Sequence, residues 1–194
     1  KMLSKKRSRE GYTFQETAEQ MFNRDSFGMM MVESGDADAL ITGVFGKYTD
    51  TINLAKDIIG IRDGFNHIGA MHIVNSKKGV LFLADTLFNR HPSSEILVDI
   101  ARLANSTVKF FAHDPVIAML SYSNFGSSNS PESNLVREAR AIVKKKDSTL
   151  ICDGEMQGIL AFNKEILKEN YPFTELIQGE INTLIFPNLA AGNI

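Results

Sequence analysis

The stretch Pro115-Val-Ile-Ala-Met-Leu-Ser-Tyr-Ser-Asn-Phe-Gly-Ser-Ser128 decides the fold class of this 194-residue chain. Its apolar run, residues 116–120, predicts a buried strand. The run stops at Ser121 and opens into a loop of Ser, Asn and Gly, and a helical pattern over residues 132–146 follows. Open α/β sheets build anion sites by delivering such a loop from a buried strand to a helix N-terminus. The segment therefore predicts a phosphate-like or nucleotide-like ligand, with Ser121 and Ser123 among its donors.

Strand-like and helix-like runs alternate along the rest of the chain. We expect helices over residues 13–34, 51–59, 93–109, 132–146 and 157–168. We expect strands over residues 39–42, 67–74, 80–84, 116–120, 149–152 and 182–186. Strands that alternate with helices of ten or more residues predict an α/β fold with a mixed, largely parallel sheet flanked by helices. The turn-rich connection over residues 75–79 predicts one antiparallel hairpin in that sheet.

Polar residues at the helix starts support these boundaries. Thr13 and Glu16 match a capping box, and Asp50 and Ser93 are expected to cap the helices that follow them. No Pro/Gly-rich linker divides the chain, so we expect one domain over residues 1–194. The last residues, 190–194, resemble the first turn of a helix, and we expect the chain to be part of a longer polypeptide.

Composition excludes several classes of partner. A formal net charge of -2 gives no basic face for nucleic acid. No run approaches the about 20 apolar residues that a membrane span requires. The single cysteine, Cys152, fits a reducing compartment, and we expect a cytoplasmic protein. The four histidines are dispersed without metal-ligand spacing, so no metal site is expected.

Polar residues gather in the loops that follow the expected strands. In a parallel sheet these loops meet at one edge, where ligands bind. The candidates are Thr49, Asp50, Thr51, Asp85, Thr86, Ser121, Ser123, Asp153, Glu155, Gln157, Asn188 and Asn193. Turn formation and helix capping would explain about half of such residues in any α/β protein. No dinucleotide-binding or Walker A motif is present, and a Ser-His-Asp triad stays open although Ser121 lacks the G-x-S-x-G elbow.

Five motifs resemble the phosphotransacetylase family, whose fold is similar to that of isocitrate and isopropylmalate dehydrogenases. They are Phe27-Gly-Met-Met-Met-Val-Glu-Ser-Gly-Asp-Ala-Asp-Ala-Leu-Ile-Thr-Gly43, Phe82-Leu-Ala-Asp-Thr86, Val116-Ile-Ala-Met-Leu-Ser-Tyr-Ser123, Asp153-Gly-Glu-Met-Gln157 and Phe186-Pro-Asn-Leu189. The chain resembles most the phosphotransacetylase-like C-terminal region of the large bacterial malic enzymes. Residues 123–127, the wording of residues 153–157, and Asn188 in place of the usual Asp favour that branch.

The resemblance implies a ligand site in a cleft between two subdomains, where active transferases bring acetyl phosphate and coenzyme A together. One family arginine matches Arg7, but the position of a second holds Asn53. The family's catalytic Ser-Arg pair and Asp lie beyond the Phe-Pro-Asn motif, so no catalytic residue is nominated here. The expected ligand-binding residues are Arg7, Asp50, Thr51, Asn53, Ser121, Ser123, Asp153, Gln157 and Asn188.

The resemblance also implies a function, with alternatives. We expect a non-catalytic region of a malic enzyme that senses acetyl-CoA, or another acyl-CoA or phosphorylated small molecule, and supports a homo-oligomer. The parent enzyme would decarboxylate malate with NADP and a divalent metal in domains N-terminal to this region. The alternative is a genuine phosphate acetyl/butyryltransferase. A vestigial pocket that serves only dimerisation is the third possibility.

Overall fold

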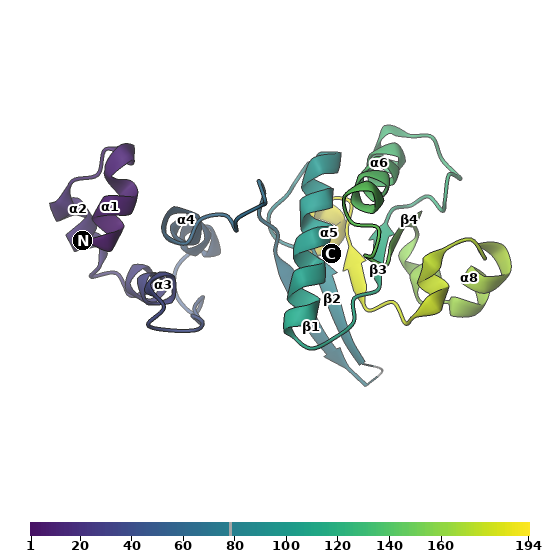
Figure 1. Cartoon of the computed structure of the whole chain (residues 1–194), viewed down its shortest axis with the longest axis horizontal. Helices are drawn as coiled ribbons and strands as arrows, with labels where there is room; N and C mark the ends of the chain where they lie inside the picture. Colours follow the sequence, from purple (N-terminus) through teal and green to yellow (C-terminus); the bar gives the residue numbers. More distant parts are fainter. Residues whose placement is uncertain (78) are drawn as a thin grey trace. The chain divides into compact units, whose positions relative to one another are not determined.

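A computed structural model describes residues 1–77 and 79–194 (Figure 1). The chain forms two compact units, Lys1–Gly64 and Phe65–Ile194. Gly60 and Gly64, both with positive φ, lie near the boundary between the two units. Two isolated glycines are too weak a signal to predict a domain boundary from the sequence. That the two units belong to one domain over residues 1–194 stays a prediction.

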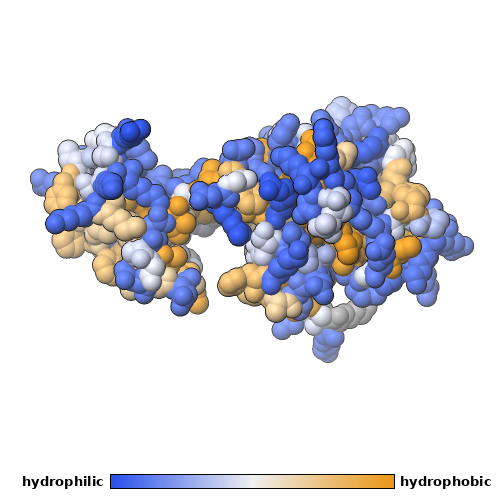
Figure 2. Space-filling view, viewed as in Figure 1, coloured by the Kyte–Doolittle hydropathy of each residue, from blue (hydrophilic) through white to orange (hydrophobic). Residues whose placement is uncertain are grey.

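The first unit consists of helices around a small apolar core. Its elements are α1 (Met2–Arg7), the 3-10 helix η1 (Ser8–Glu10), α2 (Phe14–Gln20), α3 (Arg24–Ser34) and α4 (Tyr48–Ile58). Four buried residues, Leu3, Met29, Met30 and Ile58, form the core. Phe22, Ile41 and Val44 are 89%, 98% and 85% exposed, and Figure 2 shows apolar surface on this unit. Apolar burial therefore stabilises this unit less than the second.

The expected helix over residues 13–34 is in fact two helices. The predicted capping box is confirmed, because the Glu16 backbone N–H donates to Thr13 and the Glu16 carboxylate accepts from the Thr13 backbone. Helix α2 nevertheless ends at Gln20. The side chain of Asn23 accepts from the Ser26 N–H at 3.0 Å and starts α3. Asn is a strong N-cap, so a new helix begins where the apolar spacing alone suggested continuation.

Two other expectations for this unit were wrong. Residues 39–42 form no strand, because no other strand occurs in Lys1–Gly64 to pair with them. Leu40 instead packs on α3 at Gly28, where an added Cβ would lie 2.7 Å from Leu40 Cδ1. Asp50 does not cap α4, because the helix begins at Tyr48 with Lys47 as its N-cap.

The second unit contains the predicted mixed sheet. Its strands are β1 (Met71–Ser76), β2 (Gly79–Ala84), β3 (Ile117–Leu120), β4 (Cys152–Met156) and β5 (Thr183–Ile185). The sheet order is β1-β2-β5-β3-β4. Strands β1 and β2 pair antiparallel, and the other neighbours pair parallel. The mixed, largely parallel sheet and its hairpin are confirmed.

Helices cover both faces of this sheet. The first face packs on α5 (Ser94–Phe110) and α6 (Pro131–Lys146), and Ile117 and Met119 of β3 belong to that core. Ala118 and Leu120 belong to the core on the other face, with residues of α7 (Gly158–Ala161), α8 (Lys164–Asn170) and the 3-10 helix η2 (Glu175–Gln178). The alternation follows from the two-residue period of a strand. Helix α9 (Leu189–Asn193) follows β5.

Strand β4 lies further along the chain than predicted. The apolar pattern placed a strand over residues 149–152 and a loop from Asp153 to Gln157, but Asp153 and Glu155 lie inside β4 and are buried. Arg140 pairs with Asp153 and Arg137 pairs with Glu155, and these ion pairs allow the burial of both carboxylates. The expected helix over residues 157–168 is likewise divided, because Asn163 caps a new helix by accepting from the Ile166 N–H at 3.1 Å.

Gly154 in β4 tests how closely β3 and β4 approach. Its φ is +148°, and an added Cβ would lie 2.4 Å from the Met119 carbonyl oxygen. We expect Gly154→Ala to lower the free energy of unfolding in urea by more than about 1 kcal/mol, because both backbone conformation and space are unfavourable. The control is Gly158→Ala, since no atom lies within 4 Å of an added Cβ there. Equal stability of the two variants would contradict this account.

Candidate functional site

The segments that follow the parallel strands leave the sheet at one edge, as predicted. Strands β2, β5, β3 and β4 are parallel neighbours, so their C-terminal ends share that edge. The segments there begin at Asp85, Phe186, Ser121 and Gln157. We call residues 121–130, which join β3 to α6, the serine loop.

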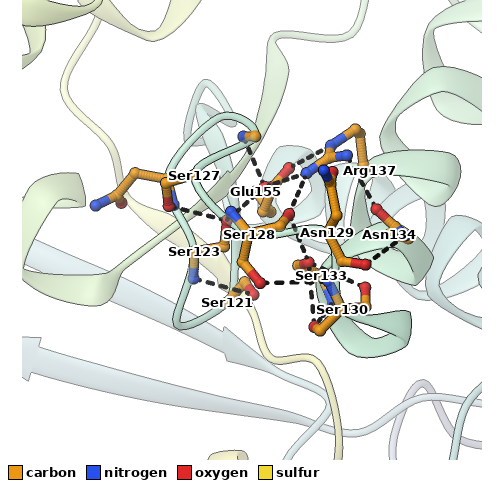
Figure 3. Close-up of polar contacts among 12 residues, drawn as sticks. Ser121, Ser123, Ser127, Ser128, Asn129, Ser130, Ser133, Asn134, Arg137 and Glu155 are labelled. Atoms are coloured by element: carbon orange, nitrogen blue, oxygen red, sulfur yellow. Dashed lines mark hydrogen bonds and ion pairs between the residues drawn. The ribbon is translucent and has the colours of Figure 1, made fainter.

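A buried carboxylate lies at the centre of the serine loop (Figure 3). Glu155 in β4 is 0% exposed. Its Oε1 accepts from Ser123 Oγ at 2.8 Å and from the Gly126 N–H at 2.9 Å. Arg137 of α6 donates from Nη2 to Oε1 at 2.9 Å and from Nε to Oε2 at 3.2 Å. The loop therefore already surrounds an anion, which is part of the chain itself.

These contacts set the charge state of Glu155. Burial acts to raise the pKa of its carboxyl group, because it removes water from the charged form. The hydrogen bonds from Arg137, Gly126 and Ser123 outweigh burial and hold the pKa below its ordinary value. Glu155 is thus ionised at neutral pH, and its partner Arg137 balances the charge.

Ser123 is occupied by the structure of the loop. It is 1% exposed, and its Oγ also accepts from the Ser128 N–H at 3.0 Å and lies 3.1 Å from Ser127 Oγ. Ser121 differs, because it is partly exposed and its Oγ only accepts a long bond, 3.3 Å, from the Ser123 N–H. Of the two predicted donors, Ser121 is the one whose hydroxyl is available to a ligand.

Gln157 lies beside the serine loop. Its N–H donates to Asn124 Oδ1 at 2.8 Å, and its Nε2 donates to the Tyr122 carbonyl at 3.1 Å. Asn124 Nδ2 in turn donates to Gln157 Oε1 at 3.1 Å. The structure therefore brings Ser121, Ser123 and Gln157 together at the edge of the sheet.

Two further predicted residues of the second unit have structural partners. Asp153 is 4% exposed and accepts from Arg140 Nε at 2.9 Å and from Thr174 Oγ1 at 2.7 Å. Asn188 caps α9 by accepting from the Ala191 N–H at 2.9 Å. A ligand role for either residue stays a prediction.

The loop after β2 is organised by Asp85. This carboxylate is 3% exposed and accepts from the backbone N–H groups of Ala70 at 3.0 Å and Asn89 at 2.8 Å, among others. Helix α9 packs on this loop, since a Cβ at Gly192 would lie 2.5 Å from the Asp85 carbonyl oxygen. The carboxylate of Asp85 therefore serves local structure, whereas the buried hydroxyl of Thr86 has no hydrogen-bond partner among the described residues.

In the first unit, Arg7 is buried and fully engaged. Its guanidinium bonds Glu10 at 2.9 Å, Asp57 at 3.2 Å and Gln20 at 3.2 Å, and it lies 3.8 Å from the centre of the Tyr12 ring. Burial acts to lower the pKa of Arg7, but the hydrogen bond with Glu10 and the charge of Asp57 outweigh it and raise that pKa. Two carboxylates of the chain thus already neutralise this cation.

A separate pocket of about 250 Å³ contains Asp50 and Thr51. Arg24 and Lys47 also line it, whereas Arg7 and Asn53 do not. Sequence reasoning missed both cations because single Lys and Arg residues are common on any surface. The one clue in the sequence was that Lys47 directly precedes α4, the helix that carries Asp50 and Thr51.

The nine predicted residues therefore fall into groups. Ser121, Ser123 and Gln157 lie together in the second unit, and Asp50 and Thr51 line one pocket of the first. That all nine form one site stays a prediction. Within residues 1–77 and 79–194, no three His, Cys, Asp or Glu side chains gather as metal ligands. No helix of this described part is long and apolar enough to span a bilayer.

Comparison with known proteins identifies the family. The family model described as "Phosphate acetyl/butaryl transferase" matches residues 1–194. The chain belongs to this family. Among solved structures, the EutD phosphotransacetylase from Staphylococcus aureus has a TM-score of 0.87 and 30% identity, covering 99% of this chain and 59% of that one. A phosphotransacetylase from Streptococcus pyogenes has a TM-score of 0.86 and 32% identity, covering 95% and 57%.

The curated relatives include malic enzymes and phosphate acetyltransferases. The NADP-dependent malic enzyme of Escherichia coli (strain K12) is 38% identical over 172 residues, which are 89% of this chain and 22% of that protein. The phosphate acetyltransferase of Bacillus subtilis (strain 168) is 35% identical over 187 residues, which are 96% of this chain and 58% of that protein. The chain thus spans under two thirds of each, and the resemblance to both branches is confirmed.

The different roles of the two serines in this family member predict different stabilities. We expect Ser123→Ala to lower the free energy of unfolding by about 1.5–3 kcal/mol, because a hydrogen bond to a buried carboxylate is lost. Ser121→Ala should change it by less than about 0.5 kcal/mol, since its side chain is partly exposed. Urea denaturation measures both, and equal losses would contradict the assignment.

The lowered pKa of Glu155 predicts a pH dependence. The carboxylate stabilises the folded state above its unfolded pKa, about 4.3, and the contribution is lost as the pH falls through the lower folded pKa. We expect Glu155→Gln to flatten the loss of stability below about pH 4.3. Urea unfolding across this range measures the slope. Glu165→Gln, at an exposed position of α8, should keep the wild-type slope; parallel curves for all three proteins would refute the prediction.

Proposed function

We propose that this chain is a non-catalytic region of a malic enzyme, which binds acetyl-CoA and supports assembly into a homo-oligomer. The observation that carries the proposal is that neither position of a family arginine presents a free positive charge. Arg7 occupies the position of a family arginine, yet Glu10 and Asp57 already neutralise it. The position of the second family arginine is Asn53. Similarity to the malic enzyme of Escherichia coli supports the same branch.

Acyl transfer needs more than the binding of its substrates. Moving an acetyl group between phosphate and thiol requires cations that stabilise the charge on the phosphate. Each charged hydrogen bond that is absent costs about 1.5–3 kcal/mol of that stabilisation. With Arg7 engaged internally and Asn53 uncharged, neither position that matches a family arginine offers a free cation to a transferring phosphate.

The pocket of the first unit supports a ligand with phosphate groups. Arg24 and Lys47 line this pocket beside the hydroxyl of Thr51. Two cations and a hydroxyl donor suit the phosphates of coenzyme A or of another phosphorylated small molecule. Asp25 and Asp50 also line the pocket and disfavour an anion in their immediate vicinity, so the proposed phosphate lies nearer the two cations than the two carboxylates.

The oxidoreductase chemistry is proposed for other parts of the parent enzyme. Oxidative decarboxylation of malate with NADP and a divalent metal is what the resemblance implies for domains N-terminal to this region. No residue of this chain is nominated for it. A cytoplasmic location of the parent enzyme is proposed on the same basis.

The alternative is a phosphate acetyl/butyryltransferase. The specific observation in its favour is the 35% identity to the phosphate acetyltransferase of Bacillus subtilis over 96% of this chain. Acetyl phosphate and coenzyme A would then be substrates, and residues outside the 194 positions would have to complete the site. The two proposals differ in turnover but share a coenzyme A ligand.

Titration calorimetry with acetyl-CoA tests the binding proposal. We expect saturable binding by the 194-residue chain, and we expect Arg24→Gln and Lys47→Gln each to weaken it by about tenfold or more. Lys56→Gln is the matched control. Lys47 precedes α4, and Lys56 lies in the last turn of α4 and does not line the pocket. Absence of binding, or equal weakening by all three variants, would refute the proposed site.

Two measurements test the rest of the proposal. A thiol-release assay with acetyl phosphate and coenzyme A should show no turnover by the chain above the uncatalysed rate. Turnover would favour the transferase alternative. Light scattering should report a dimer or a higher homo-oligomer, and a monomer at all concentrations would contradict the assembly role.

A further inference from the structure

We propose that Glu155 is a positioning residue, whose buried carboxylate sets the conformation of the serine loop together with Arg137. The loop has the composition of an anion site, but the anion at its centre comes from the neighbouring strand. Ser123 Oγ and the Gly126 N–H donate to one oxygen of Glu155, at 2.8 Å and 2.9 Å. The carboxylate thus accepts hydrogen bonds from the loop, including one from Ser123, whose hydroxyl was predicted to bind an external ligand.

Arg137 connects this carboxylate to the loop and to α6 (Figure 3). Beyond its two bonds to Glu155, it donates from Nη2 to the Ser128 carbonyl at 2.9 Å and from Nη1 to Asn134 Oδ1 at 3.0 Å. One planar guanidinium therefore contacts the strand, the loop and the helix. Its rigid fork of donors fixes their mutual orientation better than a single point charge would.

Backbone contacts extend the same connection. The Phe125 N–H donates to the backbone carbonyl of Glu155 at 2.8 Å, and Phe125 has a positive φ of 44°. A non-glycine residue adopts this conformation only when surrounding contacts favour it. Side chain and backbone of Glu155 together thus hold residues 123–126 of the loop.

The polar residues in and beside the loop therefore fall into two groups with different contacts. Ser123 and Gly126 face the internal carboxylate, whereas Ser121 and Gln157 remain at the accessible edge. That this arrangement serves ligand binding rests on the proposed function. The positioning itself is a property of the described residues and is tested without any ligand.

Carboxylate rescue tests the positioning directly. Glu155→Ala removes the carboxylate and leaves a space lined by Ser123 Oγ, the Gly126 N–H and Arg137, of a size suited to formate or acetate. We expect amide hydrogen exchange in residues 121–130 to rise by about tenfold or more while exchange in α5 changes less. Formate should restore protection and raise the melting temperature of this variant, because it supplies the missing anion. Chloride at equal ionic strength is the control, and wild type should respond to neither salt.

Two results would contradict the positioning role of Glu155. If formate and chloride act alike on Glu155→Ala, the carboxylate is not the positioning group and the proposal is wrong. If Glu155→Ala does not fold, Arg137→Gln answers the same question, because Gln keeps an uncharged N–H donor near the carboxylate and the Arg137 side chain that it replaces is 37% exposed. Unchanged exchange in residues 121–130 of Arg137→Gln would overturn the proposal.

Calorimetry with coenzyme A separates this inference from the proposed function. If wild type binds and Glu155→Ala binds about tenfold more weakly until formate is added, positioning serves the ligand. If wild type does not bind, the proposed function fails, while the exchange and rescue data still decide the role of Glu155. If Glu155→Ala binds as tightly as wild type despite a loosened loop, positioning for the ligand is refuted.

Discussion

The ion pair between the buried carboxylate of Glu155 and the partly exposed guanidinium of Arg137 is the interaction on which the serine loop and the position of α6 depend. A carboxylate without access to water is unfavourable unless a cation and hydrogen bonds accompany it. Helix α6 must therefore lie where Arg137 reaches β4. On the same helix Arg140 pairs with Asp153 and Lys144 with Glu175, at 2.9 Å and 2.8 Å. Because these three cations follow a helical spacing, they share one side of α6 and fix its rotation and its position along the sheet.

This constraint changes the interpretation of the serine loop. Its composition suggested a site for an external anion, and its geometry provides one for an internal carboxylate. The same principle applies in the first unit, where Glu10 and Asp57 satisfy Arg7. Both regions thus use charge pairs within the chain. Accessible polar groups remain at Ser121 and Gln157, and in the pocket with Arg24 and Lys47.

Much of the architecture could be predicted because it follows from local periodicity. The apolar run of β3, the amphipathic pattern of α5 and the hairpin of β1 and β2 each occupy enough residues to express a period. The errors arose where tertiary contacts oppose the local pattern. Residues 39–42 are apolar but have no partner strand, whereas residues 152–156 are polar in part yet pair with β3 because arginines neutralise their carboxylates. Asn23 and Asn163 divided two helices, since one capping side chain outweighs a continuing apolar spacing.

The fold class, the order of most elements and the family could be predicted from the sequence, because they depend on periodicity and on motifs that are contiguous in the chain. It also located the serine loop at the end of a buried strand. The contacts of that loop depend on the three-dimensional fold, because Ser123 and Glu155 are 32 residues apart and meet through the pairing of β3 with β4. Whether a hydroxyl or a guanidinium is free depends on its partners in space, and linear spacing does not specify those partners.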